Sequence, residues 1–364
     1  MKELIKNLPI WAIATDPIYI GTGGYTIGRV DNTIVRDPVT RIPKIPGSSL
    51  AGTWRYYVAL YLQSLLRDEY RLDRNKRKGI SLNELFNFGQ DRKISNSQQA
   101  ESWLNFEGNR YAAIKCASQD ESPQSDYDED IINNTGHCGH CVVCKGFGFS
   151  KADFSWQGTL FFSDLNILFF PVYTRLGVKW ITTERIIKEA GLFRETPEVK
   201  SEREHSIIAI YEKATDEIGC LNLGWLNLPY KRINAGLIDF NSLAGSFPDI
   251  NEEDICIVPE NLITQIINSN LEVRTSVSID PLTGAAKDGA LFTSEAIPRA
   301  TAFYGNIRIF DKSMFSGCNK KIGELPSAGQ LKAALKDTSH FYETLGIGGM
   351  TTRGFGRLRI NIDG

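Results

Sequence analysis

Four cysteines gather in the first half of the chain. Cys138, Cys141 and Cys144 have the spacing C-x-x-C-x-x-C, and Cys116 precedes them across an acidic segment. A structural Zn²⁺ takes four sulfur or nitrogen ligands in a tetrahedral arrangement with no open position. Three solvated cysteines at this spacing have little packing rationale, so the spacing predicts a structural zinc site.

The identity of the fourth zinc ligand is open in the sequence. Cys116 is the first choice, and His137 and His140 are the alternatives. Residues 116–137 contain six Asp and Glu and no Lys or Arg, which is typical of a solvated loop that a metal would pin. Catalytic zinc is disfavoured because no H-E-x-x-H pattern is present. Reduced structural thiols without a metal are the alternative interpretation.

A glycine-rich loop near the C-terminus could bind an anion. The stretch GIGGMTTRGFGR over 346–357 has five glycines, two threonines and two arginines. Glycines let a backbone approach a phosphate closely, while Thr and Arg supply hydrogen-bond donors. The alternative is a plain hairpin before the last strand. The residues expected to bind are Gly348, Gly349, Thr351, Thr352 and Arg353.

The elements that would position these residues alternate between strands and helices. A helix should open at Pro46, with Ser48 or Ser49 as its N-cap. Its apolar stripe consists of Leu50, Trp54, Val58, Tyr61 and Leu65. Further helices are expected over 183–190, 259–268 and 327–336. Strands are expected over 10–20, 34–35, 42–45, 156–170, 273–279, 290–295, 302–309 and 358–362.

This alternation predicts an α+β fold. A ferredoxin-like βαββαβ core with long insertions fits best. Residues 1–364 are expected to form one domain, in which 67–145 is an insertion that carries the zinc loop. Residues 270–300 are expected to form a hairpin around the turn DPLTG.

Composition excludes several classes of protein. The 364 residues carry 41 Lys and Arg against 43 Asp and Glu, so the formal net charge is −2 and nucleic acid could bind only at a local patch. No apolar run approaches the ~18 residues that a membrane span needs, and the N-terminus lacks the features of a secretory signal. An odd number of cysteines, seven, argues against a disulfide framework. We expect a cytoplasmic protein with no membrane contact.

Five stretches resemble one family. IPGSSLAGTWR, followed by a helix, and the C-terminal GIGGMTTRGFGRLRI resemble the RAMP superfamily. More narrowly, the chain resembles the RNA-binding backbone subunit of type III CRISPR effector complexes, the Cas seven family with its Cmr and Csm branches. QGTLFFSDLNILFFPVYTRLGVKWITT, RTSVSIDPLTGAAKDGALFTSEAIP and CGHCVVCKGFG extend the resemblance over most of the chain except about 67–115 and 190–255.

The resemblance implies a catalytic aspartate. Cleaving members of the family hold an Asp in the loop before the strand that leads to IPGSSL, and the matching residue here is Asp31. Its implied role is to assist attack of an RNA 2′-hydroxyl on the adjacent phosphate, with Mg²⁺ or another divalent ion. Tyr19 stands where Cmr-branch relatives often carry a histidine, which is a departure from the pattern. From the residues alone, a single Asp in a glycine-flanked loop such as Asp31 is more often a turn residue.

The resemblance also implies how RNA binds. The palm is expected to be ferredoxin-like or RRM-like and to hold the guide RNA by its phosphates and riboses, independently of sequence. The hairpin corresponds to the family's thumb, which wedges apolar side chains between nucleotides. The implied guide-binding residues beside the terminal loop are Gly47, Ser48, Ser49 and Arg55, and the implied wedge residues are Leu282, Leu291 and Phe292.

The function implied is that of a crRNA-binding backbone subunit that cleaves guide-paired target RNA as a metal-dependent endoribonuclease. Its expected partners are the crRNA, the target RNA, further copies of backbone subunits and other type III effector subunits. Three alternatives stay open: a catalytically silent backbone subunit, a guide-processing RAMP endoribonuclease, and an unrelated zinc-containing structural protein. For guide processing, His205 and His340 offer no motif.

Overall fold

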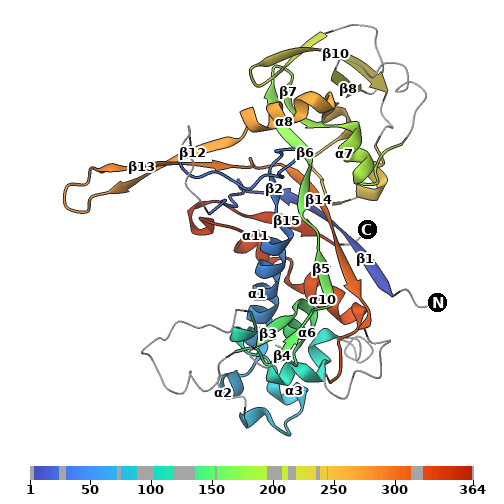
Figure 1. Ribbon diagram of the computed structural model, residues 1–364, viewed down its shortest axis with the longest axis vertical. Coiled ribbons are helices and arrows are strands. Elements are labelled where there is room, and N and C mark those ends of the chain that lie inside the picture. Colours follow the sequence, from blue (N-terminus) through green and yellow to red (C-terminus); the bar gives the residue numbers. More distant parts are fainter. Residues whose placement is uncertain are drawn as a thin grey trace. The chain divides into compact units, whose positions relative to one another are not determined.

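The chain divides into two compact units, each built from segments that are far apart in the sequence (Figure 1). The first unit comprises Met1–Leu8, Ser48–Ser163 and Ile307–Ser339, and the second comprises Pro9–Gly47, Asp164–Asn306 and His340–Gly364. This computed structural model describes residues 4–23, 30–71, 75–87, 102–117, 136–151, 154–194, 207–211, 219–234, 238–243, 245–312 and 323–362. The predicted insertion, 67–145, lies wholly within the first unit, and its status as an insertion in one domain stays a prediction.

The first unit is built around the long helix α1. Its apolar stripe is confirmed for Leu50, Trp54 and Val58, which are fully buried. Trp54 Nε1 also donates to the carbonyl of Leu335 at 3.1 Å and lies 3.1 Å from Thr338 Oγ1, which ties α1 to α10. The elements of this unit are α1 (Gly47–Leu65), α2 (Asp68–Arg71), α3 (Leu82–Leu85), α6 (Val142–Phe147), β3 (Phe149–Lys151), β4 (Phe154–Trp156), β5 (Leu160–Phe162) and α10 (Ala328–Thr338).

The predicted N-cap of α1 is wrong. The helix begins at Gly47, so Ser48 and Ser49 lie in its first turn. The Gly47 backbone N–H donates to Asp164 Oδ1 at 2.8 Å, and Asp164 Oδ2 pairs with Lys44 Nζ at 2.6 Å. The first amides of a helix have no intrahelical acceptor and favour negative charge nearby. A carboxylate remote in sequence therefore replaces the local cap.

A large mixed sheet supplies most of the second unit. The order of its strands is β15-β1-β14-β6-β7-β11-β8-β10-β9, with β2 beside β6 and β5 beside β14. β1 and β14 run through both units. The strands not yet given are β1 (Ile5–Ala14), β2 (Lys44–Ile45), β6 (Leu165–Thr174), β7 (Gly177–Thr182), β8 (Ile207–Tyr211), β9 (Gly219–Leu223), β10 (Leu226–Asn234), β11 (Ile255–Ile257), β14 (Ala302–Phe310) and β15 (Leu358–Asn361).

Four of these strands have an informative order. Taken along the chain as β1, β6, β14 and β15, they lie in the sheet in the order fourth, first, third, second. The fourth pairs antiparallel with the first and the third antiparallel with the second. Helix α1 lies in the chain between the first two, and α10 and α11 (Phe341–Thr344) between the last two. The α+β prediction is confirmed.

Three predicted strands differ from the structure. The strand predicted over 10–20 ends at Ala14 of β1, and in the stretch predicted over 34–35 Ile34 makes only an isolated bridge with Gly21. The stretch 156–170 is not continuous but contributes to β4, β5 and β6. The first break lies at Gly158. Glycine is required there because a Cβ would lie 2.4 Å from the Gly146 carbonyl oxygen. Asp164 interrupts it again, where its carboxylate turns toward α1 and Lys44.

The three shorter predicted helices are confirmed. Helix α7 (Glu184–Glu189) begins after Thr183, whose side chain accepts from the Ile186 amide at 3.3 Å. Helix α8 (Glu260–Ser269) buries its apolar side chains. Helix α10 begins with a full capping box between Ser327 and Gln330. Their caps and periodicity are local, which is why the sequence predicts them.

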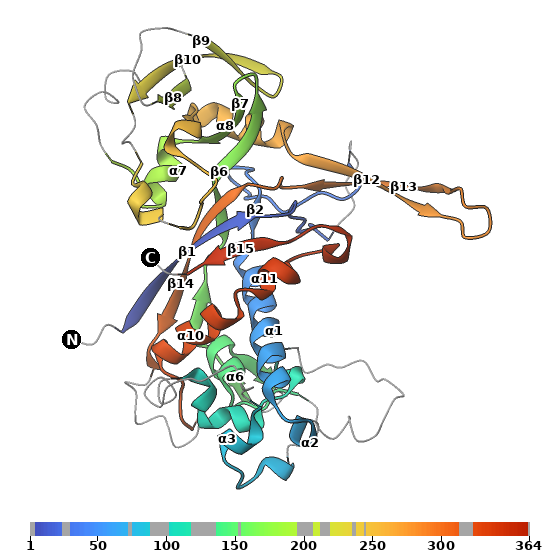
Figure 2. The same cartoon turned by 180° about the vertical axis from the view of Figure 1, so that it is seen from behind.

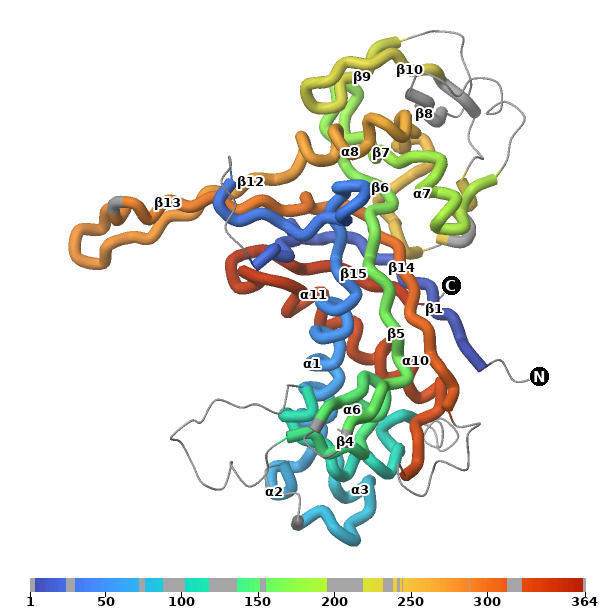
Figure 3. The backbone as a smooth tube through the Cα atoms, in the orientation of Figure 1, coloured from blue at the N-terminus to red at the C-terminus, as the bar shows by residue number. Residues whose placement is uncertain are grey.

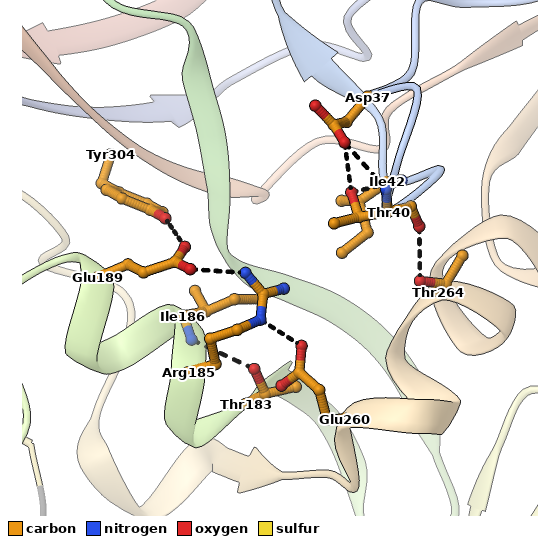
Figure 4. A network of polar contacts seen from close by, with 10 residues as sticks. All are labelled: Asp37, Thr40, Ile42, Thr183, Arg185, Ile186, Glu189, Glu260, Thr264 and Tyr304. Carbon is orange, nitrogen blue, oxygen red and sulfur yellow. Dashed lines mark hydrogen bonds and ion pairs between the residues drawn. The ribbon is translucent and has the colours of Figure 1, made fainter.

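Polar contacts tie α7 and α8 to the sheet and to the loop before β2 (Figure 4). Arg185 of α7 bridges the two helices. Its Nε lies 2.6 Å from Glu260 of α8, and its Nη1 lies 2.7 Å from Glu189 of α7. Tyr304 of β14 donates to Glu189 at 3.1 Å. Burial raises the pKa of Tyr304 and Glu189 raises it further, so this phenol stays a neutral donor. Since both acids already pair with Arg185, this network is structural.

The predicted hairpin is confirmed as β12 (Glu272–Ile279) and β13 (Ala286–Ala296), which extend from the rest of the second unit (Figure 2). Val277 pairs with Leu291, and Ser276 pairs with Phe292. Successive residues of a strand point to opposite faces. Leu291 and Phe292 therefore lie on opposite faces of the hairpin. Val277 lies on the same face as Leu291.

No helix among the described residues is long and apolar enough to cross a membrane.

Replacing the central tryptophan of α1 should test the core of the first unit. Trp54→Ala should lower the free energy of unfolding by about 3–5 kcal/mol, because it removes a fully buried ring and a hydrogen bond to α10. The matched control is Tyr56→Ala on the same helix, whose side chain is exposed and which should cost about 1 kcal/mol or less. Denaturant unfolding measures both, and equal losses would contradict this account of the core.

Candidate functional site

The four predicted cysteines form one cluster. The Sγ atoms of Cys116, Cys138, Cys141 and Cys144 all lie within 4.8 Å of one another. Three of the side chains are buried and Cys138 is half-buried. The Cys141 backbone N–H donates to Cys138 Sγ, with N and Sγ 3.3 Å apart, so the backbone already stabilises charge on that sulfur. The cluster could hold a metal ion.

The geometry favours Cys116 over either histidine as the fourth ligand. His137 Nδ1 lies 3.0 Å from Arg55 Nη2, and the exposed His140 lies against Tyr111 with ring centroids 5.1 Å apart and ring planes tilted by 50°. Arg55 Nε also donates to the Cys116 carbonyl at 2.8 Å. Hydrogen bonds from the other three thiols hold the pKa of Cys116 well below its ordinary value. The cluster therefore favours at least one thiolate.

Asp31 is fixed to the base of the β12–β13 hairpin. Its Oδ2 accepts from the Thr293 backbone N–H at 2.8 Å and from Thr293 Oγ1 at 2.9 Å. The Asp31 backbone N–H donates back to Thr293 Oγ1 at 3.1 Å. The Asp31 side chain is nevertheless exposed. An exposed carboxylate held in one place can meet a ligand without first being ordered.

The hydrogen bonds from Thr293 also set the charge of Asp31. The backbone N–H of Thr293, and then its hydroxyl, lower the pKa of Asp31 below the usual aspartate value. Donors that bond the charged form favour it. Asp31 is therefore a weak base that stays ionised, which suits holding a cation better than removing a proton.

Tyr19 lies between Gly21 and the terminal glycine-rich loop. A Cβ on Gly21 would lie 2.6 Å from the Tyr19 hydroxyl, and the Gly349 N–H donates to the Tyr19 carbonyl at 3.0 Å. A Cβ on Gly348 would lie 2.3 Å from that carbonyl oxygen. Gly348 is thus required by packing inside the protein, whatever it binds. Burial raises the pKa of Tyr19, so its phenol stays protonated at neutral pH.

Short backbone bridges join these parts within the second unit. Val35 donates to the Ile20 carbonyl at 2.9 Å, and Asn32 donates to the Thr293 carbonyl at 3.0 Å. Figure 3 shows the blue N-terminal segments passing beside the hairpin base and the red C-terminal loop. The structure therefore brings together Tyr19, Asp31, Thr293 and the terminal loop.

The polar turn of the terminal loop carries two exposed donor residues, Thr352 and Arg353. Thr351–Arg353 form a single 3₁₀ turn that follows Met350 in a left-handed conformation, with φ of 59°. Thr352 and Arg353 are exposed, while Thr351 is half-buried. Arg274 of β12 braces the loop by donating to the Gly354 carbonyl at 3.1 Å. The loop thus exposes hydrogen-bond donors on a backbone that Arg274 holds in place.

The remaining predicted site residues are placed individually. Ser48 is exposed and Ser49 half-buried in the first turn of α1. Leu282, at the tip of the hairpin, is 94% exposed. Along β13, Leu291 is 66% exposed and Phe292 is half-buried. Most of the acidic segment, the rest of the loop before Asp31, and His205 lie outside the described residues. The roles proposed for these residues stay predictions.

Two residues of the site carry no sequence signal. Thr293 meets Asp31 across 262 positions of sequence, and Asp164 meets Gly47 across 117. Neither has a motif, since only the pairing of remote strands gives them partners. The alternation of β13 could have shown only that Thr293 lies on the same face as Leu291.

The comparisons with known proteins agree with this architecture. The model of the RAMP superfamily matches residues 12–359. The CRISPR system Cms endoribonuclease Csm3 of Enterococcus italicus is 47% identical over 47 residues, which are 12% of this chain and 22% of that protein. Csm3 of Methanothermobacter thermautotrophicus is 58% identical over 36 residues, 10% of this chain and 15% of that protein. The matched segments span less than a quarter of these relatives.

A solved structure shows the fold. The crystal structure of oligomeric Cmr4 from Pyrococcus furiosus superposes with a TM-score of 0.50 at 16% identity, over 98% of this chain and 98% of that chain. The chain belongs to the RAMP superfamily. The resemblance to RAMP proteins of CRISPR systems is confirmed.

Removing one thiol should test the cysteine cluster. The protein as purified should carry about one metal ion per chain, which Cys141→Ser should lose because Cys141 is a fully buried member of the cluster. Cys220→Ser, at an exposed cysteine outside the cluster, is the matched control and should keep the ion. Elemental analysis measures both. A parent protein that folds fully without metal would contradict the assignment.

Proposed function

We propose that this protein is a crRNA-binding backbone subunit of a type III CRISPR effector complex and that it cleaves guide-paired target RNA at Asp31. Membership of the RAMP superfamily and the similarity to the endoribonuclease Csm3 support the proposal. The observation that carries it is an exposed, ionised carboxylate fixed at the base of the β12–β13 hairpin. Its partners would be the crRNA, the target RNA, further backbone copies and other effector subunits.

In the proposed reaction an RNA 2′-oxygen attacks the adjacent phosphorus and the bond to the 5′-oxygen breaks. The 2′-hydroxyl loses its proton, and the leaving oxygen gains one. Because Thr293 lowers the pKa of Asp31, we assign this carboxylate to holding a hydrated divalent ion. Mg²⁺ fits a single exposed carboxylate, since it keeps most of its waters, and it would supply charge stabilisation and a more acidic water.

Guide RNA would bind at the glycine motifs. Exposed donors of the terminal loop and the exposed Ser48 in the first turn of α1 would hold phosphates and riboses without reading sequence. Arg55 is instead bonded to the Cys116 carbonyl and His137, which supports a role in bracing the cysteine cluster. The guide-binding residues proposed are Gly47, Ser48, Ser49, Gly348, Gly349, Thr351, Thr352 and Arg353.

The β12–β13 hairpin would act as the thumb and the four-stranded core as a ferredoxin-like palm. The strand order of fourth, first, third, second supports the palm. Leu282 at the tip and the exposed Leu291 would wedge between nucleotides, whereas Phe292 would act from the opposite face. Inserting apolar side chains costs unstacking, which wrapped contacts offset.

Zinc is the ion that we propose for the cysteine cluster. Four cysteine sulfurs within 4.8 Å of one another are a set of soft ligands, which is the donor set of structural zinc. The ion would connect the 3₁₀ turn that carries Cys116 to the start of α6. Its role would be structural.

A second candidate function is a backbone subunit that binds RNA without cutting it. The specific observation in its favour is Tyr19, whose raised pKa makes it a poor base where relatives often carry a histidine. A parent complex that binds target but leaves it intact would decide for this function.

Charge reversal in the terminal loop should weaken guide binding. Arg353→Glu should lower affinity for RNA of any sequence and flatten its salt dependence, because one phosphate contact is lost. Arg359→Glu makes the same change of charge at another exposed arginine and is the control. Binding titrations at several salt concentrations measure both. An unchanged dependence of affinity on salt concentration would show that the loop is a plain hairpin that does not contact phosphate.

Removing the proposed catalytic carboxylate should stop cleavage and spare assembly. Asp31→Ala should load guide and bind target, while cleavage falls by about two to four orders of magnitude. Asp249→Ala, at another exposed aspartate, should cut at the parent rate. Gel-resolved cleavage of labelled target by reconstituted complexes gives both rates.

The parent reaction has two further expected properties. Its products should end in 2′,3′-cyclic phosphate, because the nucleophile is the RNA 2′-oxygen. A chelator should stop the reaction. Parent-rate cleavage by Asp31→Ala would place the site elsewhere.

A further inference from the structure

We propose that Thr293 is the positioning residue that holds Asp31 in its working geometry, so that the catalytic loop and the β12–β13 hairpin act as one body. The inference rests on the proposed function for its consequence in cleavage. Its structural content, the tether itself, does not depend on cleavage.

The first argument is the closed set of hydrogen bonds between the two residues. Thr293 donates twice to Asp31 Oδ2, from its backbone N–H at 2.8 Å and from Oγ1 at 2.9 Å. The same Oγ1 accepts from the Asp31 backbone N–H at 3.1 Å. One hydroxyl thus fixes both the side chain and the backbone of Asp31. Valine has the same shape but can make neither of the two hydroxyl bonds.

The second argument is that the attachment continues along the chain. Asn32 donates to the Thr293 carbonyl at 3.0 Å and accepts from the Glu295 N–H at 3.0 Å, as a short parallel strand would. Arg36 then closes the segment with an ion pair to Glu295 at 2.7 Å. The segment that carries Asp31 therefore follows the base of β13 at three successive points.

The third argument comes from the residue across the hairpin. Thr275 pairs directly with Thr293 and shares its face; its side chain is exposed, while that of Thr293 is half-buried. Among the described residues no hydrogen bond reaches the Thr275 side chain, whereas the Thr293 side chain bonds to Asp31. The two threonines have the same chemistry and neighbouring places on the hairpin, so Thr275 is the control for the contact with Asp31.

The tether has a consequence for cleavage. A carboxylate on an exposed loop samples several rotamers, and a misplacement of about 1 Å can cost up to ~100-fold in rate. Thr293 removes that freedom before RNA arrives. Since Thr293 belongs to β13, any displacement of the hairpin by a bound duplex also moves Asp31.

The first experiment compares three variants in reconstituted complexes under single-turnover conditions. Thr293→Val should cleave target about 10–100-fold more slowly than the parent at unchanged target affinity. Thr293→Ser restores the hydroxyl and should return the rate to within about threefold. Thr275→Val, the matched control, should cleave at the parent rate. An equal loss in both valine variants, or no rescue by serine, would overturn the proposal.

The second experiment reads the tether without cleavage. Hydrogen exchange of the assembled complex should become about tenfold faster in the peptide around Asp31 when Thr293 is replaced by valine. In the Asp31→Ala background the same replacement should speed exchange much less, because the side-chain bonds are already lost and only the bond from the residue 31 backbone N–H to the Thr293 hydroxyl remains to be removed. Additive effects in the two backgrounds would show that the residues act independently, and would overturn the proposal.

The two experiments separate the proposals. A parent complex that does not cut, but shows the non-additive exchange pattern, keeps the tether and removes the proposed catalysis. If the complex with Thr293→Val cuts at the parent rate while the complex with Asp31→Ala is inactive, catalysis at Asp31 stands and the role of Thr293 is removed.

Discussion

The pairing of remote backbone segments at the base of the β12–β13 hairpin is the constraint on which the second unit's site depends. Residues 17–22 bond to 32–35, and Asn32 and Asp31 bond to β13. Gly349 and Gly356 attach the terminal loop to the far side of 17–22. If one of these bridges were lost, the exposed donors and the exposed carboxylate would lose their common frame. The site is therefore a property of the sheet edge rather than of one motif.

The first unit is stabilised by a different kind of contact. Its segment 67–145 is rich in charge, yet the described part buries Phe86, Trp103 and Phe106. Two polar contacts add to this apolar core. Arg77 is almost fully buried and donates to the carbonyls of Tyr70, Arg110 and Ala112, while the cysteine cluster joins Cys116 to α6. Where a metal supplies folding free energy, ligand geometry can specify a loop that composition would leave open.

Local chemistry explains what the sequence could predict. The stripe of α1, the Thr183 cap, the Ser327 capping box and the cysteine spacing all involve residues within a few positions of one another. Remote partners explain what it could not. Asp164 replaces the expected serine cap, and Thr293 holds Asp31, each through a contact that exists only after strands have paired. The terminal glycines were predicted to approach phosphate, but Gly348 is also required by the carbonyl of Tyr19.

Tyr19 and Asp31 are shifted in opposite directions, and this limits how the site can work. Hydrogen bonds from Thr293 lower the pKa of Asp31, so its carboxylate is charged at neutral pH. Burial raises the pKa of Tyr19, so its phenol is neutral there. Neither group changes charge near neutrality. A pH dependence of the proposed cleavage would therefore come from other groups, such as water on a bound cation or the 2′-hydroxyl, while these two side chains contribute fixed charge.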